Sequence, residues 1–513
     1  MASSYTCLFA HFNSNERICE YVHTYLDHLS SLDFRIIFLS NSPINSSSRV
    51  RLEKNPGIYR IEERENTGND FGAWKWAIEN NLIPDDTNYL LLTNDSNFGP
   101  ISDLTPIFQS MLSNTGLDFW GLTDSYQGAW HIQSYFVCFS KKAFTSVAFQ
   151  SIFSQDFYGF PKKEIVQKGE ILLTQKLTAN GLKGQAYIPY SELDSNTSSL
   201  HALNPTHFYW DKLITDHKFP FVKKELILQN PENIPNINEI FPYIERNSDY
   251  SVENIKEALV DAFQSASDKT SNKPRITILC HMYYPSCIYY FMLKLAPLKL
   301  YDAHFIFNLS VALLENKYFM DILTRAFPGS IILHSPNKGR DIGGKLSAID
   351  ALLKSGTNSD YSLVIHDKLS PHTPTGKEWR DKLFKIIEKS NLPKIFSLFE
   401  QNKGTGVVAV GDFIQNEYDP DNNSFTCTSK ENLIGYIKLY GLTLSDYNFA
   451  AGTIFWIRTG ILLQFFGQHS PLAIRKGLED GNALDFTSGT NIHAWERLFS
   501  FLANAQGYKI KGI

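Results

Sequence analysis

The chain has 513 residues, of which 43% are hydrophobic and 20% are charged, and its formal net charge is −5. This composition is typical of an ordinary folded protein with room for two or three domains. A slightly acidic chain offers no basic field for nucleic acid, so no nucleic-acid partner is expected.

The cysteine pattern and hydropathy bear on location. Six cysteines without a CxxC pair favour a reduced, cytoplasmic setting. No apolar stretch is close to the length of about 18 residues that a membrane-spanning helix needs. If the protein acts at the inner face of the cytoplasmic membrane, it is therefore expected to associate with that membrane peripherally.

The first half alternates apolar strands with helical segments and one Gly-rich motif. In chain order its predicted strands cover residues 7–11, 35–40 and 89–95, and the segment DFWGLTD at 118–124 and an apolar stretch at 132–140 follow them. The motif NTGNDFGAWKWAI, which contains Asn66, Gly68 and Asp70, precedes a predicted helix. A later strand runs into Asp95, and Glu170 lies eleven residues before a glycine.

The second half repeats this order. Its predicted strands cover residues 277–281, 304–310 and 361–367, and the segment GVVAVGD at 406–412 and an apolar stretch at 450–458 follow them. The motif NKGRDIGGKLSAI supplies Asn337, Gly339 and Asp341, the next strand runs into Asp367, and Glu496 again lies eleven residues before a glycine. The aspartates that end these strands follow Asp70 and Asp341 by 25 and 26 residues, so a tandem duplication of a whole domain is predicted.

Strands that alternate with helices predict an α/β fold with mostly parallel sheets. We expect domains at residues 1–203 and 275–513, joined by a helical connector and linker at 204–274. In such sheets ligands bind at the carboxyl ends of strands, where the paired motifs fall. The basic run FPFVKKELIL in the connector could face lipid headgroups or a glycan diphosphate, although such runs are more often a solvated helix face.

Each motif has a functional and a structural interpretation. Asp95 and Asp367 could hold a divalent cation, Mg²⁺ or Mn²⁺, against a diphosphate, or they could only close the turn after a strand. The Gly-rich loops could bind a donor at a helix amino end, or Asp70 and Asp341 could merely cap that helix. Glu496 is placed at the amino end of a predicted helix, where a carboxylate also suits the helix dipole.

The amino-acid sequences of several segments resemble those of the rhamnan synthesis protein F family. The resemblance rests on NTGNDFGAWKWAI, YLLLTNDSNFGP, HIQSYFVCFSKKAF and NPTHFYWDKLI in the first half, and on GRDIGG, FAAGTIFWIR and HAWERLFSFLANAQGYKI in the second. The order of motifs is similar to that of glycosyltransferase family 2. That similarity implies two GT-A-type modules, with Glu170 and Glu496 as general bases and Asp95 and Asp367 at the metal motif, whose first carboxylate is replaced here by Thr93 and Ile365.

The resemblance implies a glycosyltransferase that extends a bacterial surface polysaccharide. Its donor would be a nucleotide sugar such as dTDP-L-rhamnose, and its acceptor a lipid-linked glycan. The hypotheses are two active sites that make two linkages, one active module with a degenerate acceptor-binding module, or a noncatalytic glycan-binding protein.

Overall fold

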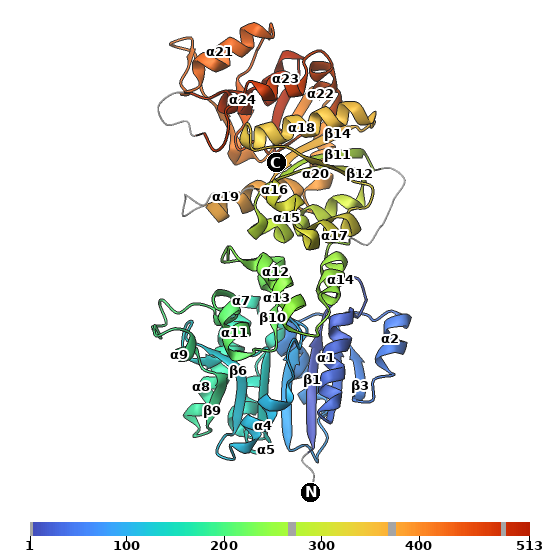
Figure 1. Ribbon diagram of the computed structural model, residues 1–513, viewed down its shortest axis with the longest axis vertical. Coiled ribbons are helices and arrows are strands. Elements are labelled where there is room, and N and C mark those ends of the chain that lie inside the picture. Colours follow the sequence, from blue (N-terminus) through green and yellow to red (C-terminus); the bar gives the residue numbers. More distant parts are fainter. Residues whose placement is uncertain (1–3, 265–272, 368–375, 484–488) are drawn as a thin grey trace. The chain divides into compact units, whose positions relative to one another are not determined.

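The computed structural model describes residues 4–264, 273–367, 376–483 and 489–513. The chain forms two compact units, Met1–Leu259 and Val260–Ile513 (Figure 1). The polar run that was expected to act as a linker falls largely at residues 265–272, outside the described residues.

The first unit is built on an eight-stranded sheet. Its strands run in the order β3-β2-β1-β4-β8-β6-β7, and β9 pairs with β6. The first four of these strands are parallel, whereas β8 is antiparallel to both of its neighbours. The bounds are β1 (Tyr5–His11), β2 (Phe34–Ser40), β3 (Ile58–Glu63), β4 (Tyr89–Asn94), β6 (Phe119–Ser125), β7 (His131–Ile132), β8 (Phe136–Ser140) and β9 (Gly184–Ile188).

The second unit is built on a seven-stranded sheet with the order β13-β12-β11-β14-β20-β15-β21. Here too the first four strands are parallel and β20 is antiparallel to both neighbours. The bounds are β11 (Arg275–Met282), β12 (Asp302–Leu309), β13 (Ile331–His334), β14 (Tyr361–His366), β15 (Thr405–Ala409), β20 (Phe455–Arg458) and β21 (Lys509–Gly512). Three short strands, β16 (Ile414–Asn416), β17 (Tyr418–Asp419) and β18 (Ser424–Phe425), follow β15, and β19 (Asn448–Ala450) pairs with β16.

The two sheets therefore share one topology, in which the last strand, β9 or β21, pairs in parallel with β6 or β15. The predicted α/β class is confirmed. The apolar stretches 132–140 and 450–458 are not single strands. Each is interrupted by a turn, which separates β7 from β8 and β19 from β20.

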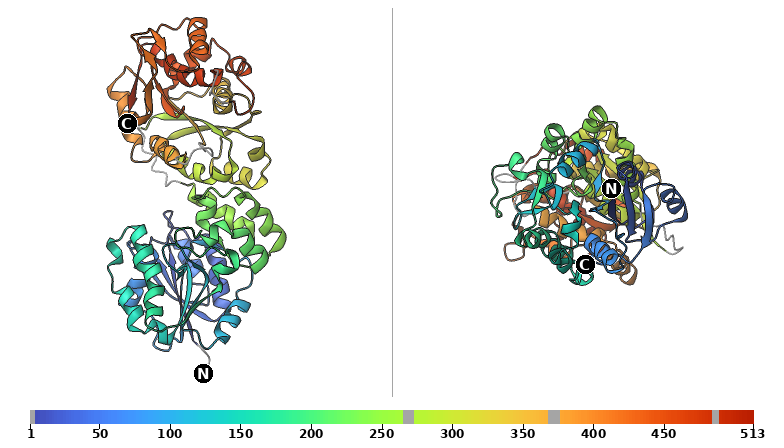
Figure 2. Two further views of the ribbon diagram at one scale, coloured as in Figure 1. Left: turned by 90° about the vertical axis from the view of Figure 1, so that its left-hand side faces the viewer. Right: turned by 90° about the horizontal axis from the view of Figure 1, so that it is seen from below.

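Helices lie on both faces of the first sheet (Figure 2). Because side chains alternate along a strand, Leu8 and Ala10 of β1 pack in one cluster with Trp74 of α3, whereas the ring of Phe9 meets that of Tyr25 on α1 at 5.3 Å. The helices of this part are α1 (Glu20–Ser31), α2 (Ser46–Leu52), α3 (Asn69–Glu79), α4 (Thr105–Ser113), α5 (Lys141–Phe144), α6 (Val147–Phe153), α7 (Lys162–Ile165), α8 (Leu172–Ala179) and α9 (Tyr190–Leu193).

A core of the same kind fills the second unit, where Leu279 of β11 packs with Leu346 of α18 and Trp495 of α24. Its helices are α15 (Ile288–Leu295), α16 (Val311–Leu314), α17 (Lys317–Ala326), α18 (Arg340–Ser355), α19 (Gly376–Leu383), α20 (Leu392–Gln401), α21 (Lys430–Leu439), α22 (Thr459–Phe466), α23 (Pro471–Lys476) and α24 (Asn491–Ala505). In the described parts of both units, no helix is long and apolar enough to cross a membrane.

Up to Leu259, the segment that follows residue 204 belongs to the first compact unit. Its helices are α10 (Pro205–Phe208), α11 (Trp210–His217), α12 (Lys224–Leu228) and α13 (Ile240–Asn247), and α14 (Val252–Ala262) leads into the second unit. Between α11 and α12, the short strand β10 (Val222–Lys223) pairs with β5 (Asn97–Phe98), directly after β4. The segment is thereby fixed at the carboxyl end of the first sheet.

Candidate functional site

The two Gly-rich loops have the same conformation and begin equivalent helices. Gly68 and Gly339 precede α3 and α18 with φ of 73° and 76°, a left-handed conformation that glycine adopts without strain. A Cβ on Gly68 would also lie 2.8 Å from the carbonyl oxygen of Phe157. These glycines are therefore required by the backbone, and the repeat reflects a repeated local structure.

Asp70 does not act as the helix cap that one interpretation of the sequence expected. The cap position belongs to Gly68, and Oδ2 of Asp70 accepts a hydrogen bond of 2.7 Å from Nδ2 of Asn94, at the end of β4. Burial raises the pKa of Asp70 to about 6, helped by the nearby charge of Asp95. In the second unit, Asp341 instead forms an ion pair of 2.7 Å with the buried Lys345.

Asp95 and Asp367 occupy equivalent places beyond β4 and β14. The backbone N–H of Asp95 donates to Ala10 of β1, and that of Asp367 donates to His281 of β11, both at 3.1 Å. Oδ2 of Asp367 accepts bonds of 2.8 and 2.6 Å from the N–H groups of Tyr283 and Tyr284. Both aspartates thus join the loop after the first strand to the end of the fourth.

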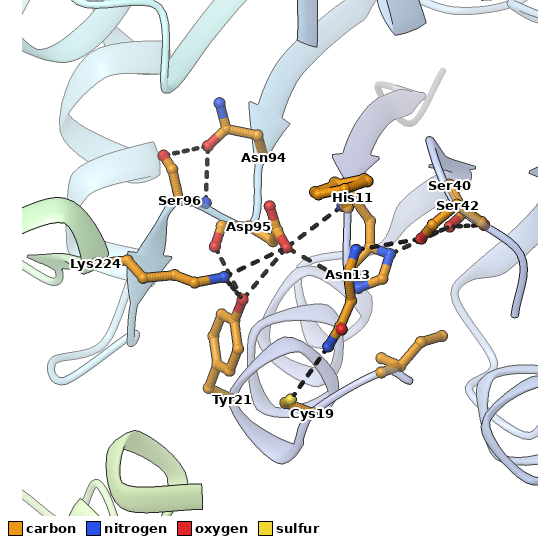
Figure 3. Close-up of polar contacts among 12 residues, drawn as sticks. His11, Asn13, Cys19, Tyr21, Ser40, Ser42, Asn94, Asp95, Ser96 and Lys224 are labelled. Carbon is orange, nitrogen blue, oxygen red and sulfur yellow. Dashed lines mark hydrogen bonds and ion pairs between the residues drawn. The ribbon is translucent and has the colours of Figure 1, made fainter. Parts of the chain in front are cut away.

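The surroundings of Asp95 are those of an ion pair (Figure 3). Nζ of Lys224 lies 3.8 Å from its Oδ2 and donates a 2.7 Å bond to the hydroxyl of Tyr21, which in turn bonds to Asp95. Nε2 of His11 lies 3.9 Å from the same oxygen. An ammonium group already faces this carboxylate, so the residues around Asp95 fit a divalent cation poorly.

At the second predicted metal position, Oδ2 of Asp367 is already bound by the two backbone N–H groups of Tyr283 and Tyr284, and burial raises the pKa of this carboxyl group to about 8. Within the described residues, no group of three or more His, Cys, Asp and Glu side chains is arranged to hold a metal.

Glu170 lies in an irregular part of its helix. The segment between α7 and α8 is a π-helical turn, η2 (Val166–Ile171), a feature that is often found at functional sites. Oε2 of Glu170 accepts a 2.6 Å hydrogen bond from the hydroxyl of Ser134, and Oε1 lies 3.2 Å from Nε2 of His131. Both partners come from β7 and the turn that separates it from β8.

The contacts of Glu170 and His131 favour the ionised form of both groups. Nδ1 of His131 lies 2.8 Å from the carbonyl oxygen of Ala129, so both ring nitrogens face oxygen acceptors, as an imidazolium requires. Burial opposes charge on both groups. The hydrogen bond and the opposite charge overcome burial, so the pKa of Glu170 is lowered and that of His131 is raised.

Glu496 has an equivalent position with a different set of partners. It is the sixth residue of α24, so it lies in the second turn and not at the amino end that was expected. Its Oε1 accepts a 2.6 Å bond from the N–H of Gly452, and its Oε2 accepts a 2.8 Å bond from Nη1 of Arg497. The pairing of β4 with β8 and of β14 with β20 makes Gly452 the counterpart of Ser134, so the same turn holds both glutamates.

Each glutamate shares a cavity with the aspartate of its own Gly-rich motif. A cavity of about 560 Å³ in the first unit is lined by Asn66, Asp70 and Glu170. A cavity of about 290 Å³ in the second is lined by Asp341 and Glu496. The other predicted residues, Gly68, Asp95, Asn337, Gly339 and Asp367, do not line these two cavities.

Three further residues line the first cavity that motif spacing had not indicated: His131, Ser134 and Lys223. Ser134 lies within the apolar stretch 132–140 and His131 directly before it, and the turn within that stretch gave no signal in the sequence. Lys223 belongs to the basic run FPFVKKELIL, for which a diphosphate was one of the interpretations considered.

A comparison with protein families identifies the chain. The model of the family described as "Rhamnan synthesis protein F" matches residues 36–508. The chain belongs to this family. The match includes both Gly-rich motifs and both glutamates.

Other proteins resemble parts of this rhamnan synthesis protein F family member. Virulence protein VirA of Vibrio anguillarum is 30% identical over an alignment 218 residues long, and the alignment covers 37% of this chain and 69% of VirA. The glycosyltransferase GlyE of Streptococcus pneumoniae TIGR4 has 12% identity and a TM-score of 0.28, over 74% of this chain and 90% of GlyE. A putative nucleotide-diphospho-sugar transferase of Desulfovibrio desulfuricans G20 has 12% identity and a TM-score of 0.24, over 36% and 80% of the two chains.

Proposed function

We propose that the protein is a glycosyltransferase that adds a sugar, L-rhamnose from dTDP-L-rhamnose, to a lipid-linked precursor of a bacterial surface polysaccharide. Family membership and the α/β fold support this proposal. The observation that carries it is the meeting of Glu170 with Asn66 and Asp70 in one cavity at the carboxyl end of the first sheet. We place the reaction in the cytoplasm, at the inner face of the membrane.

In this reaction Glu170 is the general base. Its carboxylate takes the proton of the acceptor hydroxyl, the acceptor oxygen bonds to the anomeric carbon of the donor, and the bond from that carbon to the diphosphate breaks. Because the oxygen attacks from the face opposite the diphosphate, the product has inverted stereochemistry. His131 keeps Glu170 ionised, and Ser134 fixes the orientation of its carboxylate.

The second unit is the candidate for a second transfer site, which would let one chain make two linkages. The equivalent placement of Glu496 and Asp341 in one cavity favours this role. The cavity of the second unit is smaller than that of the first, and Glu496 is paired with Arg497. Both observations favour the alternative, a degenerate module that binds the acceptor. Domain limits of 1–203, 204–274 and 275–513 remain part of the proposal.

Matched variants separate these roles. Glu170→Gln and Glu496→Gln each remove one negative charge and keep the shape of the side chain. In the full chain, with dTDP-L-rhamnose and a lipid-linked acceptor, we expect Glu170→Gln to lower transfer at least about 100-fold, the size of a general-base contribution. Loss of one product linkage in Glu496→Gln means that the second unit is also active; unchanged linkages assign it to acceptor binding.

A third outcome separates an enzyme from a noncatalytic glycan-binding protein. If the wild-type chain binds glycan but releases no nucleotide from any of the dTDP, UDP and GDP sugars, the transferase proposal is wrong. Unaltered transfer in Glu170→Gln would leave the enzyme class intact but remove this residue as the base.

A further inference from the structure

The first cavity contains a lysine that comes from outside the duplicated motifs. Lys223 ends β10, and its backbone pairs with that of Asn97 in β5. Since β5 follows the end of β4 within a few residues, this pairing brings Lys223 to the same edge of the sheet as Asp70 and Glu170. Its side chain is half-buried and lines the cavity.

The ammonium of Lys223 has neutral partners. Nζ lies 3.3 Å from Oγ of Ser96 and 3.8 Å from the centre of the Tyr135 ring. Across the described residues, no carboxylate lies within 4.0 Å of it, the limit for a salt bridge. Glu170, Glu225 and Asp70 act on it only at longer range, and burial lowers its pKa to about 8. An ammonium group without an ion-pair partner at the wall of a cavity suits an anionic ligand.

The neighbouring lysine has a different role. Lys224 points to Asp95 and Tyr21, which lie outside the cavity wall. This ion pair lies beside the pairing of β10 with β5, which is what holds the backbone of Lys223. Asp95, the residue predicted to hold a metal ion, is thus paired with a lysine.

We propose that Lys223 binds the diphosphate of the nucleotide sugar in the first cavity and neutralises it as it leaves, in place of a divalent cation. This inference rests on the proposed function. A positioned ammonium stabilises the charge that develops on the departing diphosphate, which is the task of a metal ion in an enzyme that uses one. The proton of the acceptor hydroxyl still goes to Glu170, and Lys223 remains protonated throughout.

The test uses two adjacent lysines. Binding of inorganic pyrophosphate, dTDP and thymidine to the full chain is measured by calorimetry in EDTA, for wild type, Lys223→Gln, Lys223→Arg and Lys224→Gln. We expect Lys223→Gln to weaken pyrophosphate and dTDP binding about tenfold or more, while thymidine binding stays within about twofold of wild type. Lys223→Arg keeps the charge and is expected to retain binding. Lys224→Gln, which removes an equal charge outside the cavity, is expected to bind within about threefold of wild type.

Other results overturn the inference. It is wrong if Lys223→Gln binds dTDP as tightly as wild type, if binding of dTDP and pyrophosphate appears only when Mg²⁺ or Mn²⁺ is added, or if neither ligand binds at all. A transfer assay on the same samples distinguishes the failure of this inference from the failure of the proposed function. If Lys223→Gln leaves sugar transfer unaffected, the role of the lysine is wrong and the glycosyltransferase proposal stands. If dTDP binding depends on Lys223 but no sugar is transferred, the lysine site stands and the glycosyltransferase proposal is wrong. Thermal unfolding of each variant confirms that the chain is folded.

Discussion

His131 is expected to set the pH range in which Glu170 is ionised. Between the lowered pKa of Glu170 and the raised pKa of His131 both groups are charged, and their attraction stabilises the fold. This stabilisation is lost at low pH, when Glu170 takes up a proton, and at high pH, when His131 loses one. Replacing His131 by Phe removes the positive partner, and Phe449 is the residue at the equivalent place in the second unit.

The size of the effect follows from the contacts. His131→Phe deletes one hydrogen bond between charged groups, worth about 1.5–3 kcal/mol. With burial of Glu170 no longer opposed by the imidazolium, the pKa of this carboxyl group should rise. If Glu170 is the base, the acid limb of the profile of kcat/KM against pH moves to higher pH.

The assay is steady-state transfer between pH 4 and 9 for wild type and His131→Phe. The control is His217→Phe, which breaks another His–Glu pair of the first unit, with Glu192 at 3.5 Å and away from the cavity. An acid limb at the same pH in wild type and His131→Phe would refute the reasoning, because the imidazolium would then not be what keeps the base ionised. A shift in the His217→Phe control would show that the profile reports stability instead.

Three further predictions test the structure around the site. Gly68→Ala forces a Cβ into a left-handed backbone, 2.8 Å from the carbonyl oxygen of Phe157, so we expect a stability loss of at least about 1–2 kcal/mol and reduced transfer. Gly116→Ala, where the nearest atom lies at 3.4 Å, should change both quantities little. Equal melting temperatures for the two variants would contradict this prediction. Burial lowers the pKa of His23 to about 4, so the stability that its neutral form contributes is complete above pH 6.5 and is lost as the pH falls from 6.5 towards 4. In urea unfolding, His23→Gln should reduce this acid-induced loss of unfolding free energy by on the order of 2 kcal/mol. The same dependence of unfolding free energy on pH in both proteins would show that the histidine is not buried in its neutral form. Asp95→Asn removes the charge opposite Lys224 and so breaks the same ion pair as Lys224→Gln. As for that variant, dTDP binding in EDTA is expected to stay within about threefold of wild type; a larger loss that excess Mn²⁺ restores would favour the metal role instead.

The central strands of both sheets could be predicted from the sequence because strands buried on both faces of a parallel sheet consist of continuous apolar residues. The segments that end at His11 and His281 are of this kind, and they form the central strands β1 and β11. The interval from each glutamate to its glycine was also informative, since it spans a helix and the turn into the last strand. Such local patterns survive in sequence because each depends on residues that are close together in the chain.

The partners of the two glutamates could not be predicted in this way. A turn of three or four residues between apolar strands leaves no periodic signal, yet it supplies Ser134 in one unit and Gly452 in the other. The first donates a hydroxyl hydrogen bond and the second a backbone N–H, so the contact is kept although the residue types differ. Backbone donors are invisible to any comparison of side chains.

The charge partners of the two glutamates show how the units have diverged. Glu170 is paired with an imidazolium, whose charge depends on pH, whereas Glu496 is paired with Arg497, which is permanently charged and is also bound to Glu417 at 2.8 Å. A carboxylate that shares an arginine with another glutamate is held in a fixed ionic network. A carboxylate opposite a histidine and facing a larger cavity can exchange protons with what binds there. The duplicated fold therefore supports chemistry in the first unit more directly than in the second, and the Glu496→Gln variant tests that ranking: loss of a linkage would reverse it.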